Sequence, residues 1–183
     1  GALVENNEFN VYARAGTTTN ESMCINMSST VSTAPGSNCI VRRNKCGIFA
    51  PSARGIQIGD SSTLSYNDNC EVYENEVTGE YYSTATPHGI SLGRVTGGKI
   101  WGNKIMNIYA GILTGINQAG LIAANLLIGC YGPSLFSKGC GATTQVIFAH
   151  NTIILLNTVG LARGYAAIGV ASQGATNNAA TLF

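Results

Sequence analysis

The densest group of acidic side chains in this chain lies between positions 68 and 80, and it comprises Asp68, Glu71, Glu74, Glu76 and Glu80. Cleavage of a glycosidic bond commonly uses two carboxyl groups that lie roughly 5–9.5 Å apart. Residues i and i+2 of a strand point to the same face, so Glu74 and Glu76 would approach each other if the backbone between them is extended. We therefore take Asp68, Glu74 and Glu76 as candidate catalytic residues, with Asp68 supplied by a neighbouring strand.

Two other interpretations of this acidic group stay open. It would serve as a solvated face that keeps the protein soluble, or it would bind calcium through its carboxylate oxygens. His88 and His150 are isolated and no Cys-x-x-Cys occurs, so we expect no zinc site. The sequence therefore predicts no cofactor and no metal centre, with calcium as the one alternative.

A short repeated pattern, apolar-x-x-Asn-x-apolar, must position these side chains. Successive Asn residues of the pattern are 37, 31, 28, 22 and 26 residues apart, at Asn7, Asn44, Asn75, Asn103, Asn125 and Asn151. A module that returns every ~20–50 residues is typical of a solenoid, in which each repeat forms one rung. Asn tolerates the left-handed backbone, and stacked Asn side chains can hydrogen-bond to one another, so we expect a corner and an Asn ladder here.

A second strand in each repeat is predicted by phrases that begin with Gly-Ile. They are Gly55-Ile-Gln-Ile-Gly, Gly89-Ile-Ser-Leu-Gly and Gly111-Ile-Leu-Thr-Gly. The alternation would put Ile56 and Ile58 on one inward face. We expect one domain over 1–183, with loop insertions at about 15–38 and 129–141, and we expect it to be a segment of a longer chain.

Two aromatic residues occupy the same slot of the repeat. Tyr73 and Trp101 each follow the first apolar residue of the pattern and should point outward from consecutive rungs. Aromatic rings in such places stack on sugars or pack against a neighbouring chain. We therefore take Tyr73 and Trp101, joined by Tyr109, as candidate carbohydrate-binding residues, or as part of a subunit interface. Isolated exposed aromatics are also ordinary on protein surfaces.

The cysteines follow the repeat as well. Cys46 fills an inward slot and should be a buried free thiol, while Cys39 and Cys70 each lie five residues before their Asn and should stack in adjacent rungs. Cys24 could pair with Cys39, and Cys130 with Cys140. The even number of six cysteines does not decide between a reducing and an oxidising compartment.

The composition of the chain limits the kinds of partner that it could bind. The net charge is +1, which does not indicate nucleic acid, and no apolar run reaches the ~18–20 residues of a membrane span. Charged residues are 10% of the chain, a low fraction that stacked β-structures tolerate because Ser, Thr, Asn and Gly can cover their surface. All nine acidic residues lie at or before Glu80, so carboxylate chemistry belongs to the first half of the chain or to another chain.

Nearly the whole chain resembles right-handed parallel β-helix proteins of the pectate-lyase-like type. The resemblance rests on Val72-Tyr-Glu-Asn-Glu-Val, Ile100-Trp-Gly-Asn-Lys-Ile-Met-Asn and Phe148-Ala-His-Asn-Thr-Ile. It implies an all-β, right-handed, single-stranded parallel β-helix of about six turns. The group includes polysaccharide lyases, hydrolases, epimerases and esterases. It also includes bacteriophage tailspikes and tail fibres, which are usually trimers that bind or cut cell-surface glycans.

Three functions follow from this resemblance. The first is a tailspike or tail-fibre segment in a virion tail, a homotrimer that binds, and in some cases cleaves, bacterial surface polysaccharide. The second is a monomeric extracellular polysaccharide lyase or hydrolase, and the third is a passive structural or adhesive β-solenoid. Because fold and function are separable, the sequence leaves open whether the chain is an enzyme.

Overall fold

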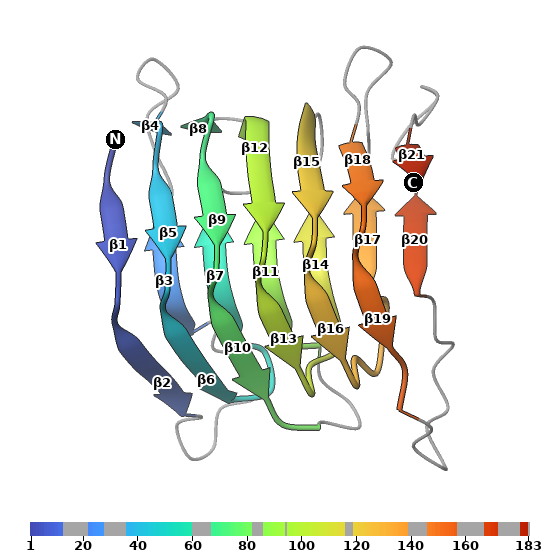
Figure 1. Ribbon diagram of the computed structural model, residues 1–183. Coiled ribbons are helices and arrows are strands. Elements are labelled where there is room, and N and C mark those ends of the chain that lie inside the picture. Colours follow the sequence, from blue (N-terminus) through green and yellow to red (C-terminus); the bar gives the residue numbers. More distant parts are fainter. Residues whose placement is uncertain are drawn as a thin grey trace.

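The structure of this chain is a computed structural model, which describes residues 1–12, 22–27, 36–59, 67–81, 86–93, 95–115, 119–138, 146–156, 167–171 and 180–182. Within these ranges the chain forms strands and turns and no helix. The strands make three sheets, in which every pair of described neighbours is parallel (Figure 1). The prediction of an all-β protein with parallel strands is confirmed.

Each sheet takes one strand in turn from successive passes of the chain. Sheet A contains β1 (Leu3–Glu5), β5 (Ile40–Arg42), β9 (Glu71–Tyr73), β12 (Val95–Trp101), β15 (Ala119–Ala123), β18 (Val146–Ala149) and β21 (Ala180–Leu182), with the two-residue strands β4 (Gly36–Ser37) and β8 (Asn67–Asp68) beside them. Sheet B contains β2 (Glu8–Tyr12), β6 (Lys45–Phe49), β10 (Glu76–Gly79), β13 (Lys104–Met106), β16 (Leu126–Ile128) and β19 (Thr152–Ile154). Sheet C contains β3 (Met23–Met27), β7 (Arg54–Ile58), β11 (His88–Leu92), β14 (Ala110–Thr114), β17 (Leu135–Lys138) and β20 (Ile168–Ala171).

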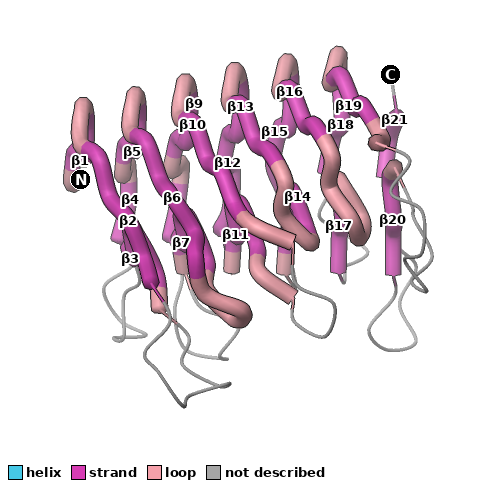
Figure 2. Tube along the Cα trace, turned by 90° about the horizontal axis from the view of Figure 1, so that it is seen from below, coloured by secondary structure: helices cyan, strands magenta, loops and turns pink. Residues whose placement is uncertain are grey.

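The chain therefore visits sheets A, B and C in order and then returns to sheet A beside the strand it left. We call one such pass a rung. Figure 2 shows successive rungs side by side, and in Figure 1 the two termini lie at opposite ends of the stack. This arrangement of three parallel sheets is compatible with a β-solenoid.

Inward side chains form continuous rows because the strands are in register from rung to rung. In sheet A the row Val41, Val72, Ile100, Ile122 and Phe148 is 0–2% exposed. In sheet C, Ile56 and Ile58 are both fully buried, as the alternation predicted. Burying aliphatic and aromatic side chains stabilises the stack by about 1.5–3 kcal/mol for each one.

The corner between sheets A and B differs from the prediction. The left-handed residue is the one before each ladder Asn, not the Asn itself. This position is occupied by Asn6, Arg43, Glu74, Gly102, Ala124 and His150, with φ between 52° and 64° for all six. The assignment of the left-handed conformation to the motif Asn was wrong, because the Asn keeps a backbone that turns its amide into the protein.

The predicted Asn ladder is confirmed. Asn44, Asn75, Asn103 and Asn125 are 1–2% exposed. The Nδ2 of each donates to the Oδ1 of the next ladder Asn at 2.9–3.0 Å, and its backbone N–H donates to the same oxygen at 3.0–3.1 Å. Nδ2 also reaches the carbonyl oxygen two residues earlier in its own rung. Every ladder amide is thus satisfied by the corners around it.

Glycine opens the corner at which sheet C begins. A Cβ on Gly55, Gly89 or Gly111 would lie 2.5–2.6 Å from a carbonyl oxygen of the following rung, so no side chain fits there. These are the glycines of the Gly-Ile phrases.

The predicted loop insertions contain strands. The insertion 15–38 contains β3 of sheet C and β4 of sheet A, and 129–141 contains all of β17 of sheet C. Residues 13–21, 28–35 and 139–145 lie outside the described residues.

The thiols follow the predicted slots in part. Cys46 is 2% exposed and free, and Cys39 and Cys70 are buried in adjacent rungs, where Glu71 N–H donates to the Cys39 carbonyl oxygen at 2.8 Å. Cys24 lies beside Cys46 and not beside Cys39, so the predicted Cys24–Cys39 pairing is wrong. Cys140, the predicted partner of Cys130, lies outside the described residues.

Candidate functional site

The outer face of sheet B carries a row of alternating charges. The residue that follows each ladder Asn points outward from the start of a sheet B strand, and the row reads Glu8, Lys45, Glu76, Lys104, Leu126 and Thr152. Lys104 Nζ lies 3.2 Å from Glu76 Oε1. Exposed ion pairs of this kind contribute only ~0–1 kcal/mol. Their main effect is therefore to hold charged groups at fixed places on the surface.

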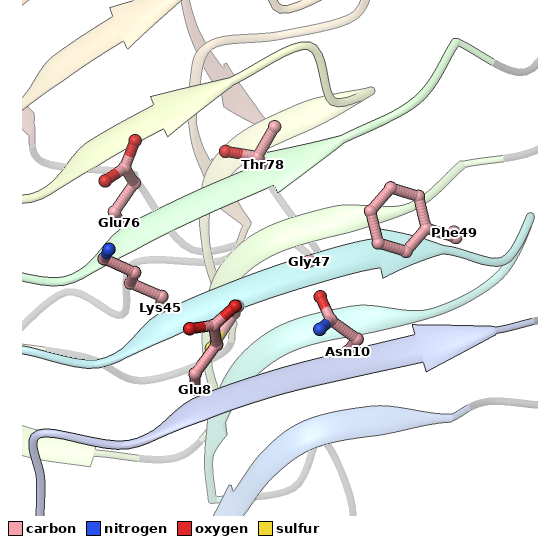
Figure 3. Close-up of a pocket in the computed structure, with 8 residues that line it drawn as sticks. Glu8, Asn10, Lys45, Gly47, Phe49, Glu76 and Thr78 are labelled. Carbon is pink, nitrogen blue, oxygen red and sulfur yellow. The ribbon is translucent and has the colours of Figure 1, made fainter.

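A groove of about 260 Å³ lies over this face at the N-terminal end of the row. Figure 3 shows Glu8, Lys45 and Glu76 side by side on three adjacent strands, with Asn10 and Thr78 on either side of Gly47. β2 and β10 are two strand spacings apart, or about 9.6 Å. The groove thus has a carboxylate on each of its outer strands and an ammonium group between them.

Gly47 forms the floor of the groove. A Cβ at this position would lie 2.2 Å from Asn10 Oδ1 and 2.7 Å from the Phe49 ring. Glycine therefore lets the Asn10 amide and the Phe49 ring lean over β6. A side chain at this position would push both of them outward.

An aromatic pair lies at the far end of the groove. The rings of Tyr12 and Phe49 are stacked in adjacent rungs, with centroids 5.1 Å apart and an interplanar angle of 18°. Phe49 lines the groove, and Tyr12 is 68% exposed. The groove therefore combines carboxylate, ammonium, amide and hydroxyl groups with an aromatic wall, a combination suited to a ligand with polar substituents and apolar ring faces.

The three predicted catalytic residues do not lie in one place. Glu76 lines the groove, whereas Glu74 occupies the left-handed corner and forms an ion pair with Arg43 at 2.8 Å. The backbone between them is not extended, so they do not share a strand face. Asp68 belongs to β8, beside Ser37 and Thr96 in sheet A. The acidic residue that faces Glu76 across the groove is Glu8.

The predicted sugar-binding aromatics are divided between two places. Tyr73 and Trp101 point outward from sheet A in register, and their rings are stacked with centroids 4.3 Å apart at 7°. The guanidinium of Arg42 lies 5.9 Å from the Tyr73 centroid and donates to its hydroxyl. Hydrogen bonds to Glu5 and then to Tyr73 raise the pKa of Arg42 above its ordinary value.

Tyr109 lies elsewhere, at the corner where sheet B leads to sheet C. Its ring contacts Tyr131 edge to face, with centroids 5.8 Å apart. It therefore shares no surface with the Tyr73–Trp101 stack.

On sheet A, one face of the Trp101 indole remains open. The face that points away from Tyr73 is directed toward Ala123, its in-register neighbour, which is too small to cover an indole.

Another concavity, of about 200 Å³, lies on sheet C, and its polar lining residues are Arg54, Gln57, His88, Ser91 and Thr114. Burial, together with the nearby charge of Arg54, lowers the pKa of His88 to about 4. His88 Nδ1 and Thr114 Oγ1 are buried without hydrogen-bond partners. His88 is therefore neutral near pH 7, and its Nδ1 is buried in this neutral form.

The described residues contain no cluster of three or more His, Cys, Asp or Glu side chains able to hold a metal ion. Glu71, Glu74 and Glu76 each form an ion pair with a basic side chain. None of the described segments is a helix with the length and apolar character needed to cross a bilayer.

The geometry defines an all-β protein of stacked parallel sheets with a polar and aromatic groove on sheet B. A scan against protein-family models found no match to the chain, and searches of curated proteins and of solved structures also found none.

Proposed function

We propose that this chain is part of a right-handed, single-stranded parallel β-helix of about six turns that binds bacterial surface polysaccharide, as phage tailspikes and tail fibres do. The observation that carries the proposal is the groove on sheet B. It places carboxylates, an ammonium group, an amide and a hydroxyl beside the aromatic pair Tyr12 and Phe49. In this proposal the protein is a homotrimer in a virion tail or another extracellular assembly.

The chemistry of a glycan fits this groove. Sugar hydroxyls can donate to Glu8 and Glu76 and accept from Lys45, while Asn10 and Thr78 offer both donors and acceptors. The apolar face of a pyranose can pack against Phe49. Because the groove crosses several strands along the stack, it suits an extended polymer better than a compact metabolite.

Cleavage would be an additional activity of the same surface. Glu76 is the predicted catalytic residue that lies in the groove, and Glu8 is the second carboxylate there. A lyase or hydrolase would release oligosaccharides, and Glu76→Gln would abolish that release. A binding protein would retain intact polymer.

Binding can be tested with the full chain and a panel of purified bacterial capsular polysaccharides and lipopolysaccharides. We expect Phe49→Ala and Glu76→Gln each to weaken binding about tenfold, as loss of an anchor residue does. Thr152→Ala changes the same outward row far from the groove and should leave affinity unchanged. Absence of binding across the panel, or equal affinity of all variants, would overturn the proposal.

A passive structural solenoid is the second candidate. It is favoured because polar side chains bind to one another from rung to rung within the chain. Examples are Lys99 and Glu71, 3.0 Å apart, and the Asn ladder. Solution mass separates these functions further, because a monomer that releases oligosaccharides would exclude both the trimeric spike and the passive rod.

A further inference from the structure

Three successive rungs each carry a tyrosine where sheet B leads to sheet C: Tyr81, Tyr109 and Tyr131. Tyr131 is 6% exposed and contacts both of the others edge to face. Its hydroxyl donates to the Glu80 carbonyl oxygen at 3.1 Å, which fixes its orientation. Tyr81, 4.9 Å away between centroids, is half exposed. The column therefore has a buried ring, Tyr131, and an exposed ring, Tyr81.

A cavity of about 340 Å³ opens beside this column. Its apolar walls are Tyr81, Tyr131 and Leu156, and its polar lining residues are Glu80 and Asn107. The volume lies within the ~300–1,000 Å³ range of small-ligand sites.

Small residues keep this cavity open. A Cβ on Gly129, which has φ +64°, would lie 2.9 Å from Leu156 Cδ1 and 3.0 Å from Asn107 Oδ1. A Cβ on Gly79 would lie 2.9 Å from the Asn107 carbonyl oxygen. A larger residue at either position would therefore displace the walls of the cavity.

The cavity continues the sheet B groove. Thr78 lines the groove and the next residue, Gly79, lines the cavity, so the two adjoin at the end of β10. The groove covers the rungs of β2, β6 and β10, whereas the cavity lies against the rungs of β10, β13, β16 and β19. One extended ligand that runs along the stack would meet the polar groove first and the apolar cavity next.

We propose that this cavity is a subsite for the N-acetyl group of an amino sugar, an inference that rests on the proposed polysaccharide binding. An acetamido group has a methyl end, which the tyrosine and leucine walls would accept. It also has an amide N–H and a carbonyl oxygen, which the Asn107 side-chain amide can meet with an acceptor and a donor. A plain hexose has no methyl group for the apolar walls.

Saturation-transfer NMR on the full chain tests this subsite, with N-acetylglucosamine, glucose and a 6-deoxyhexose as separate probes. We expect strong saturation of the acetyl methyl group, weaker transfer to the 6-deoxy methyl group and none above background for glucose. Tyr81→Ala and Asn107→Gly should each reduce the affinity for N-acetylglucosamine about tenfold. Glycine is chosen at position 107 because its φ of 53° is left-handed, which Gly adopts without strain.

The outcomes separate this inference from the proposed function. Leu3→Ala removes an exposed apolar side chain from another sheet, and this control should leave N-acetylglucosamine binding unchanged. Equal saturation of all three sugars, or full binding by Tyr81→Ala, would overturn the subsite even if polysaccharide still binds in the groove. Binding of N-acetylglucosamine that needs Tyr81, without any polysaccharide binding, would retain the subsite and reject the proposed function.

Discussion

The indole of Trp101 lies flat on the phenol ring of Tyr73, one rung away, with centroids 4.3 Å apart and planes 7° from parallel. Both rings project from the outer face of sheet A, yet Tyr73 is only 8% exposed. Trp101 and Arg42 cover Tyr73 from the two neighbouring rungs. A side chain that points outward in this fold can thus be almost completely covered by the side chains of the two adjacent rungs.

This stack should have a measurable coupling energy. In a double-mutant cycle, Tyr73→Ala and Trp101→Ala should show an interaction of ~0.5–1.5 kcal/mol in the free energy of unfolding. The cycle is measured by chemical denaturation. Additive effects of the two substitutions would mean that the ring contact contributes no stability.

Substitution of a ladder Asn should lower the free energy of unfolding far more than the small size of its side chain suggests. Asn103→Ala removes bonds to the carbonyl oxygens of Val72 and Trp101, and it removes the Oδ1 that accepts from both the backbone N–H and the Nδ2 of Asn75. We expect a loss of ~3 kcal/mol or more in the free energy of unfolding. Asn7→Ala is the matched control at the exposed end of the ladder, where a smaller loss is expected. Equal effects at the two positions would contradict this account.

Two glycines should be destabilised to very different extents by the same added methyl group. Gly89→Ala places a Cβ 2.5 Å from the Gly111 carbonyl oxygen and should destabilise the protein by ~2–3 kcal/mol or prevent folding. Gly102→Ala places a Cβ no closer than 3.8 Å to other atoms, at a left-handed corner where Ala124 already stands one rung away. It should cost only ~1 kcal/mol of backbone strain. Thermal unfolding of both variants measures the difference.

Acid should destabilise the protein through His88. Its pKa is lowered to about 4 in the folded protein, from about 6.5 in an unfolded chain, so the unfolded state binds a proton more readily between these values. The contribution of neutral His88 to the free energy of unfolding is roughly 3 kcal/mol at most. It is fully present above pH 6.5 and is lost as the pH falls toward 4. Unfolding of wild type and His88→Gln between pH 7 and 4 should show a flatter pH dependence in the variant.

The thiols should differ sharply in reactivity. A hydrogen bond with Cys46 lowers the pKa of the half-buried Cys24, whereas burial raises the pKa of Cys70 and of Cys130 to about 12. Thiolates react and thiols do not, so iodoacetamide at pH 8 should label Cys24 well before Cys70 and Cys130. Peptide mass spectrometry with and without denaturant gives the order. Fast labelling of Cys70 in the native protein would contradict its burial.

The residues that repeat with constant chemistry were predictable. Each ladder Asn lies between two apolar residues, and this pattern alone locates a core row in sheet A and another in sheet B. The left-handed corner was missed because its occupants, among them Arg43, Glu74 and Gly102, share no chemistry. They share a backbone angle, which the burial of the following Asn amide imposes.

The candidate groove could have been predicted in part from the repeated Asn pattern. The residue after each ladder Asn reads Glu, Lys, Glu, Lys in the first four sheet B strands with this motif, a signal that is visible in the sequence. The roles of Gly47 and Phe49 were not visible, because they depend on how far β6 extends beyond the motif. Tyr109 was grouped with Trp101 because the lengths of the corners, which decide where a ring emerges, cannot be read from the repeat.

The alternating row on sheet B also carries information about the order of stacking. The Asn ladder is the same at every level, so an Asn corner would accept any other rung as its neighbour. If one rung were omitted during folding, Glu8 would lie directly on Glu76, or Lys45 on Lys104, and like charges at that spacing repel. The uniform Asn amides thus allow any two rungs to stack, and the alternating charges disfavour every order in which a rung has been skipped.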